Sequence, residues 1–130
     1  MPMKSGDTFL MPAPGISNRT PHLWIVLTDP AEEDPTVVIV SITTLRHGAD
    51  QTMILGKGEH PFITRASCVF YADALLVDVR ELDSKAKLGH IQMREPCSAQ
   101  TLANVRAGIL ASDFTPQKVQ RFYQNLIKPK

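Results

Sequence analysis

The sequence is poor in cysteine and has no apolar run long enough to span a membrane. Its two cysteines, Cys68 and Cys97, are too few for a disulfide framework and lack the CxxC spacing of a zinc site. We expect both to be buried as small apolar residues. The first residues lack the apolar core of a signal peptide, and every apolar run is far shorter than a bilayer requires. These absences predict a cytoplasmic protein with no membrane partner.

The common signatures of nucleotide and metal enzymes are also missing. The sequence contains no P-loop, dinucleotide glycine fingerprint, HExxH or GxSxG motif, and no carboxylate cluster suited to Mg²⁺. The four histidines, at positions 22, 47, 60 and 90, have no metal-ligand spacing. We therefore expect no cofactor and no metal.

The composition is that of an ordinary globular protein, with 130 residues of which 43% are hydrophobic and 21% charged. This length predicts a single domain covering residues 1–130. Charge is distributed unevenly, because residues 65–130 contain ten Lys/Arg and six Asp/Glu. The basic C-terminal end could contact a phosphate backbone or an acidic partner, or it could complete the end of a helix.

Short runs of β-forming residues fill the first two-thirds of the chain. The run at residues 36–44 is the most secure strand, because β-branched residues occupy most of its positions. Glycine and proline separate the runs. The predicted strands are residues 6–11, 22–27, 36–44, 52–55, 67–71 and 74–79. Their number and spacing predict a small β-barrel over residues 1–95.

The chain after residue 80 has helical patterns. Residues 80–88 predict a short helix stopped by Gly89, and Ser98 can cap a second helix whose apolar positions 102, 105, 109 and 110 form one stripe. Thr115 followed by Pro116 predicts the start of a third helix. Residues 96–130 are thus a helical extension of the same domain, and the fold class is mainly β, within α+β.

Polar residues gather at the ends of the predicted strands. Cleavage of a phosphodiester needs a base that titrates near neutral pH, a cation for the anionic transition state, and groups that orient the phosphate. Histidine, arginine and threonine supply these roles. The candidates are His22, Thr43, Thr44, Arg46, His60, Arg65 and Ser67. If they form a site, His22, Thr43 and Arg46 must converge within one concave groove.

Each candidate also has a structural alternative. His22 could be a structural histidine whose ring nitrogens bond protein groups, and the imidazole of His60, beside a proline, could simply bond the backbone of a rigid turn. Arg46 could bind phosphate or merely pair with Asp50 or Glu59. Arg65 could form a purely structural network with Asp73 and Tyr71, and this is the interpretation we favour for that group. Trp24, the only tryptophan, is expected in the core.

The order of elements resembles the PemK/MazF-like toxins of bacterial toxin–antitoxin modules. The resemblance covers residues 6 to about 80 and rests on three strands: Gly6-Asp-Thr-Phe-Leu, His22-Leu-Trp-Ile-Val-Leu-Thr28 and Val38-Ile-Val-Ser-Ile-Thr-Thr44. It implies an SH3-like barrel that cleaves single-stranded RNA without a metal. The helical pair at the C-terminus is longer than the helix usual in the family.

The resemblance also implies functional residues. The family's usual catalytic pair is an arginine at the start of the second strand and a threonine or serine at the end of the third. Thr43 or Thr44 matches the hydroxyl position, whereas His22 stands where the arginine is usual, unless Arg19 in the preceding loop replaces it. We expect His22 or His60 to act as base or acid.

The remaining roles and partners follow from the same comparison and from the chemistry. Arg46 would hold the phosphate charge, an assignment that comes from chemistry and not from the family pattern, and the predicted substrate-binding residues are Arg19, His60, Arg65 and Ser67. The expected partners are single-stranded RNA, an antitoxin protein and a second copy of the chain. The alternatives are a non-catalytic SH3-like module that binds protein and a toxin homologue that has lost catalysis.

Overall fold

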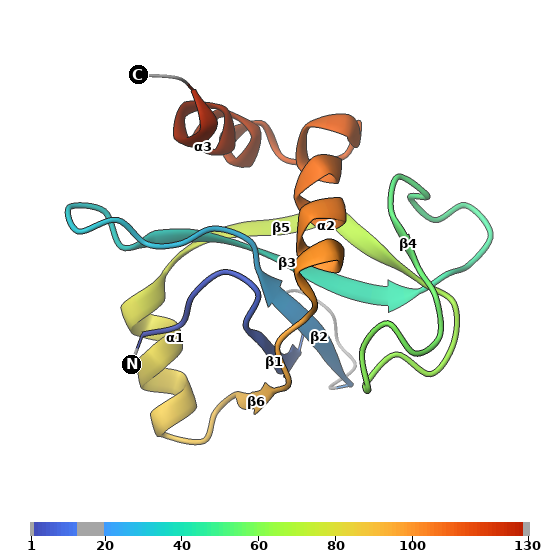
Figure 1. Ribbon diagram of the computed structural model, residues 1–130, viewed down its shortest axis with the longest axis horizontal. Helices are drawn as coiled ribbons and strands as arrows, with labels where there is room; N and C mark the ends of the chain where they lie inside the picture. Colours follow the sequence, from blue (N-terminus) through green and yellow to red (C-terminus); the bar gives the residue numbers. More distant parts are fainter. Residues whose placement is uncertain (1, 13–19, 129–130) are drawn as a thin grey trace.

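The computed structural model describes residues 2–12 and 20–128. These residues form a six-stranded antiparallel sheet with the order β4-β5-β3-β2-β1-β6, and three helices (Figure 1). In chain order the elements are β1 (Thr8–Pro12), β2 (Pro21–Val26), β3 (Thr36–Thr44), β4 (Ile54–Leu55), β5 (Ser67–Asp78), α1 (Val79–Lys87), β6 (Gln92–Arg94), α2 (Ala99–Ala111) and α3 (Gln117–Ile127). The sheet curls into a half-barrel, and the expected α+β fold of six strands with two C-terminal helices is confirmed.

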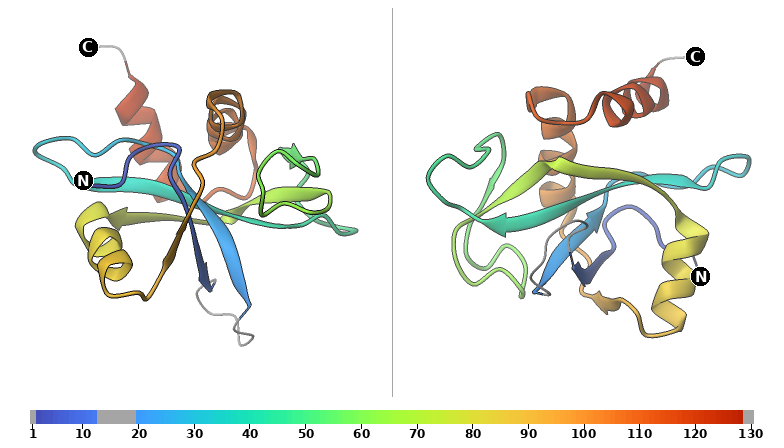
Figure 2. Two further views of the ribbon diagram at one scale, coloured as in Figure 1. Left: turned by 60° about the horizontal axis from the view of Figure 1, so that its bottom comes forward. Right: turned by 180° about the vertical axis from the view of Figure 1, so that it is seen from behind.

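The central strands are covered on both faces. In β2, Leu23 and Ile25 face a cluster that includes α2 and α3, whereas Trp24 and Val26 face a cluster that includes α1 (Figure 2). The same alternation continues in β3, because side chains along a strand point to opposite faces in turn. Burial on both faces explains why these strands are almost continuously apolar.

The long strand β5 corrects one prediction. The two strands expected in this stretch are a single strand that contains an irregularity in its pairing with β3. Ile39 pairs with Leu75, but Ser41 pairs with Phe70, so four residues of β5 lie opposite one residue of β3. The sixth strand is instead β6, an exposed three-residue edge strand that pairs with β1 and that the sequence did not predict.

Local signals account well for the first two helices. The Asp78 carboxylate accepts a hydrogen bond of 2.8 Å from the N–H of Arg80 at the start of α1. Gly89, with φ +80, follows the C-cap Leu88 and stops the helix, as expected. The Ser98 side chain accepts from Thr101 N–H at 3.1 Å and caps α2, which confirms that prediction.

The start of α3 differs from the sequence prediction. Pro116 and not Thr115 occupies the N-cap position, and no side chain caps the helix. The Thr115 hydroxyl is buried and has no hydrogen-bond partner among the described residues. Leu110, expected on the buried stripe of α2, is 41% exposed, whereas Val105 and Ile109 are buried.

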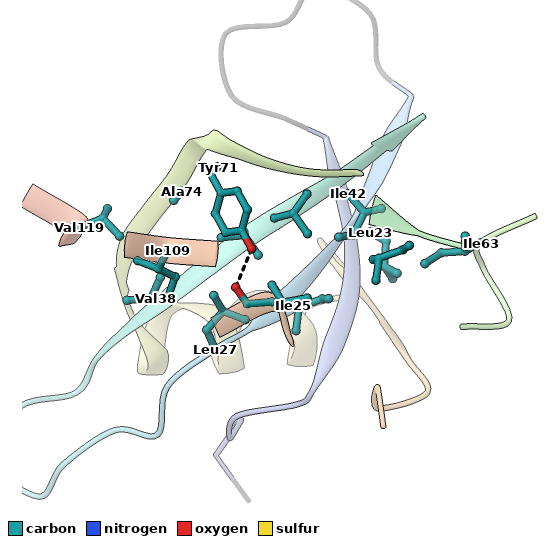
Figure 3. Packing of buried hydrophobic residues seen from close by; sticks show 14 of the residues in the cluster. Leu23, Ile25, Leu27, Val38, Ile42, Ile63, Tyr71, Ala74, Ile109 and Val119 are labelled. Atoms are coloured by element: carbon teal, nitrogen blue, oxygen red, sulfur yellow. Dashed lines mark hydrogen bonds between the residues drawn. The ribbon is translucent and has the colours of Figure 1, made fainter. Parts of the chain in front are cut away.

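The Tyr71 ring joins β5 to α2 in the core (Figure 3). Its hydroxyl donates a 2.6 Å hydrogen bond to the carbonyl oxygen of Val105, and burial raises the pKa of the phenol. The ring lies so close to α2 that a Cβ at Gly108 would overlap the hydroxyl and the ring. Trp24 is wholly buried, as expected, and its indole N–H donates to Met11 O at 3.0 Å.

The structure bears on the predictions made for the two cysteines and for the apolar runs. Cys68 is buried as expected, whereas Cys97 is only half-buried, and burial raises the pKa of both thiols. No helix within the described part of the chain is both long and apolar enough to cross a membrane.

Candidate functional site

A groove of about 570 Å³ lies where the start of β2, the end of β3 and the loop before β5 meet. Figure 1 and Figure 2 show these three segments side by side, away from α1. The predicted residues that line the groove are His22, Thr43, Thr44, Arg46, Arg65 and Ser67. The structure therefore brings His22, Thr43 and Arg46 to one concave surface, although they come from separate parts of the chain.

Strand register places His22 beside the hydroxyl residues. Leu23 pairs with Ile42 in the antiparallel pair of β2 and β3. The residue before Leu23, His22, therefore lies opposite the residue after Ile42, Thr43. The ring Nδ1 of His22 lies 3.3 Å from the carbonyl oxygen of Ile42. Because a carbonyl oxygen only accepts, Nδ1 carries a proton, and in the neutral form of the ring Nε2 keeps its lone pair. Nε2 has no hydrogen-bond partner among the described residues, which is the arrangement that a general base needs.

The charge of the groove is positive. The Arg46 and Arg65 side chains are exposed, and the salt bridge present in the described part of the molecule joins a different pair, Arg80 and Asp78. None of the described residues that line the groove is aspartate or glutamate. Two guanidinium groups without competing carboxylates favour binding of an anion such as phosphate.

Of the two alternatives for Arg46, the pairing with Asp50 or Glu59 is not seen among the described residues. The Asp50 carboxylate accepts hydrogen bonds from Thr52 and from Ser112, at 2.5 Å and 2.6 Å to their hydroxyls. Burial alone would raise the pKa of Asp50, but these hydrogen bonds outweigh it and hold the pKa below its usual value. The Glu59 carboxylate is likewise occupied, since it accepts from a backbone N–H three residues before it.

The favoured network of Arg65, Asp73 and Tyr71 is also absent. The Tyr71 hydroxyl bonds the backbone of α2 instead. Asp73 has a buried carboxylate oxygen with no partner among the described residues, and burial raises the pKa of this carboxyl. When the His22 imidazole is protonated, its charge partly offsets that rise, because it favours the ionised carboxylate. Asp73 is thus an electrostatic neighbour of His22.

Two predicted substrate-binding residues have limited support. Ser67 lines the groove, but its hydroxyl is buried and donates a 2.9 Å hydrogen bond to the carbonyl oxygen of Arg65. Its role in the structure is to fix the loop that carries Arg65. Arg19, the possible replacement for the family's arginine, lies outside the described residues.

His60 is a structural residue and not part of the groove. It is 4% exposed, and its Nδ1 accepts a hydrogen bond of 3.0 Å from Phe62 N–H. Its Nε2 therefore carries the proton and donates to the carbonyl oxygen of Glu95 at 2.6 Å, with the Thr8 hydroxyl 3.2 Å away. Because both ring nitrogens are occupied, the predicted acid–base and binding roles of His60 do not fit this geometry.

An exposed aromatic ring, missed by the sequence reasoning, completes the groove. Phe62 is 39% exposed and lines the groove together with Pro61. The Arg94 guanidinium of β6 lies 5.9 Å from the centre of its ring, at cation–π distance. The feature of the sequence that could have indicated an exposed ring is a phenylalanine directly after a proline, in a turn rich in polar residues.

The described residues contain no group of three or more His, Cys, Asp or Glu side chains that could hold a metal ion. Comparison of the chain with models of known protein families finds no match, and comparison with curated proteins finds none either.

Proposed function

We propose that the protein is an endoribonuclease that cleaves single-stranded RNA without a metal ion, as the toxin of a toxin–antitoxin pair. The observation that carries the proposal is the groove itself. Among the described residues it combines an imidazole whose Nε2 has no hydrogen-bond partner, two guanidinium groups outside any salt bridge and two threonine hydroxyls, and no carboxylate enters its lining. These groups suit an RNA phosphate and its neighbouring 2′-hydroxyl.

The reaction needs one proton carrier. His22 Nε2 removes the proton of the RNA 2′-hydroxyl, and the 2′-oxygen forms a bond to phosphorus. The bond from phosphorus to the 5′-oxygen then breaks, and the protonated His22 returns the proton to that leaving oxygen. The products are a 2′,3′-cyclic phosphate and a free 5′-hydroxyl. No water or metal is consumed in this step.

The other groups act on charge and position. Arg46 and Arg65 neutralise the charge that builds on the phosphorane oxygens, and Thr43 or Thr44 donates a hydrogen bond to the phosphate. In this proposal the two arginines replace the arginine that the resembled family has where this chain has His22. The enzyme works in the cytoplasm, pairs with a second copy, and is held inactive by an antitoxin protein.

The direct test is cleavage of single-stranded RNA by the purified protein in EDTA. We expect cleavage to leave a 2′,3′-cyclic phosphate end, and a 2′-deoxy substitution at the cleaved nucleotide to abolish it. Removal of the general base in His22→Ala is expected to slow cleavage by roughly 10²- to 10⁴-fold. A gel assay with end-labelled RNA measures both.

Matched variants separate site chemistry from general damage. His90→Ala removes an exposed histidine that lines none of the described hollows near the groove, and Arg121→Ala does the same for an arginine on α3. Both should cleave at the wild-type rate, whereas Arg46→Ala should not. Absent cleavage by the wild type, or equal cleavage by His22→Ala, overturns the proposal. If the wild type leaves RNA intact but copurifies with the product of an adjacent gene, the groove is a protein-binding surface.

A further inference from the structure

A second hollow adjoins the groove on the side of the C-terminal helices. Its volume is about 360 Å³, and Thr43, Thr44 and Arg46 line both it and the groove. Its other walls include Phe70 on β5 and Phe114 on the connection between α2 and α3. A chain bound at the shared residues would therefore have its next segment in this second hollow.

Phe114 is unusually exposed for an aromatic side chain. It is 62% exposed, and Phe62 is the other strongly exposed phenylalanine of the described residues. Phe62 lines the groove and Phe114 lines the second hollow, so each of the two adjoining hollows has one exposed ring in its wall. Exposure of a single apolar side chain needs no ligand to explain it, but an exposed ring that lines a hollow beside a guanidinium group offers a flat apolar surface to a ligand bound there.

The Phe114 ring is carried by an anchored segment. The Ser112 hydroxyl, which is buried, donates a 2.6 Å hydrogen bond to the Asp50 carboxylate. The N–H of Phe114 donates to the same Ser112 oxygen at 3.1 Å. These bonds tie the connection between α2 and α3 to the loop that follows β3, and they anchor the backbone of Phe114 to the loop that also carries Arg46.

We propose that Phe114 stacks on the base of a nucleotide next to the phosphate held at Arg46. The inference rests on the proposed function and extends it to the C-terminal helical pair. Arg46 and His47 line the same hollow and favour a phosphate, whereas its one acidic lining residue of the described chain, Asp50, is engaged by Thr52 and Ser112. An aromatic ring beside a cation is the arrangement that binds single-stranded nucleic acid without regard to sequence.

The test measures binding of a 2′-fluoro RNA oligonucleotide, which lacks the nucleophilic oxygen and cannot be cleaved. Loss of one stacked base weakens binding by roughly 5- to 150-fold, so Phe114→Ala should raise the Kd within that range. Phe114→Tyr keeps the aromatic face and should stay near the wild type. Leu126→Ala is the control, because it also removes a large exposed apolar side chain, 47% exposed, but on α3.

A fluorescence experiment shows stacking directly. Trp24, the only tryptophan of the sequence, is wholly buried. In Phe114→Trp the new indole is therefore the one exposed to solvent. We expect RNA to quench it, and an abasic nucleotide at one position of the oligonucleotide to remove the quenching. Normal RNA binding and cleavage by Phe114→Ala would overturn this inference and leave the proposed function standing. A wild type that neither binds nor cleaves RNA overturns both, and loss of only a protein partner in Phe114→Ala makes the hollow a protein interface.

Discussion

Two histidines show how differently the chain uses polar side chains in its groove and in its interior. His22 and His60 each stand next to a proline, and the sequence makes both of them candidates for the acid or base. In the structure, His60 is buried with both ring nitrogens bonded to protein, whereas His22 is half-buried and its Nε2 has no hydrogen-bond partner among residues 2–12 and 20–128. The availability of a ring nitrogen therefore distinguishes a chemical role from a structural one.

The same contrast extends to the other polar groups of the two regions. In the interior, the Tyr71 hydroxyl and the Trp24 indole each donate to a backbone carbonyl. In the groove, the Arg46 and Arg65 guanidinium groups are exposed to solvent. Interior polar groups fix the positions of helices and loops, because an unmade buried hydrogen bond is costly. We therefore expect interior substitutions to reduce stability and groove substitutions to reduce activity.

The largest expected effect on stability is that of Gly108→Ala on α2. In an exposed helix this change would stabilise by about 1 kcal/mol, since alanine is the better helix former. Here the new methyl group would overlap the Tyr71 ring, so we expect the free energy of unfolding to fall by about 3 kcal/mol. Urea unfolding followed by circular dichroism measures it.

The reverse change nearby is a control for this effect. Ala107 is exposed on the same helix, and Ala107→Gly should lower stability by about 1 kcal/mol through helix propensity alone. If Gly108→Ala proves neutral or stabilising, the ring of Tyr71 does not press on α2, and the interior is less tightly packed around Gly108 than the structure indicates.

The next largest effect compares the two histidines directly. His60→Ala removes the acceptor of Phe62 N–H and a buried ring, and should lower the free energy of unfolding by about 2 kcal/mol. His22→Ala removes one long hydrogen bond at a half-buried position, and should change it by less than about 0.5 kcal/mol. Thermal or urea unfolding of both variants measures the difference. A stable His60→Ala protein with lost RNA cleavage would return His60 to the site.

Local patterns predicted much of the fold. The bounds of β3, residues 36–44, follow from its β-branched composition, and Ser98 caps α2 as its position predicts. The strand-end placement of His22, Thr43 and Arg46 also sufficed to suggest a shared groove, because polar residues after apolar strands lie at the edge of a sheet.

Contacts between distant residues explain what the sequence did not predict. The partners of His60 include Thr8 and Glu95, which are 52 and 35 residues away, so no local pattern shows that its ring is occupied. Strand β6 is three exposed residues whose only reason to be extended is pairing with β1. Pro116 occupies the N-cap position of α3, where the sequence pattern predicted Thr115.

The smallest effect concerns Asp50, which links the loop after β3 to the C-terminal helices. Its pKa is lowered in the folded protein, so its stabilising effect is complete above the unfolded-state pKa of about 3.9 and disappears as the pH falls through the lower folded value. Asp50→Asn should therefore lower the free energy of unfolding by less than about 1 kcal/mol at pH 7, and its difference from the wild type should shrink as the pH falls below about 3.9.

Unfolding at several pH values measures this effect, and Asp113→Asn, an exposed aspartate beside Phe114, is its control. Because Asp50 positions Phe114 through Ser112, Asp50→Asn should also weaken RNA binding more than its small stability loss explains. That outcome would make Asp50 a residue of both regions, structural in its bonds and functional in what it holds. If RNA binding is unchanged and the loss of stability does not depend on pH, Asp50 has neither role. That result would contradict the proposed link between the helical pair and the groove.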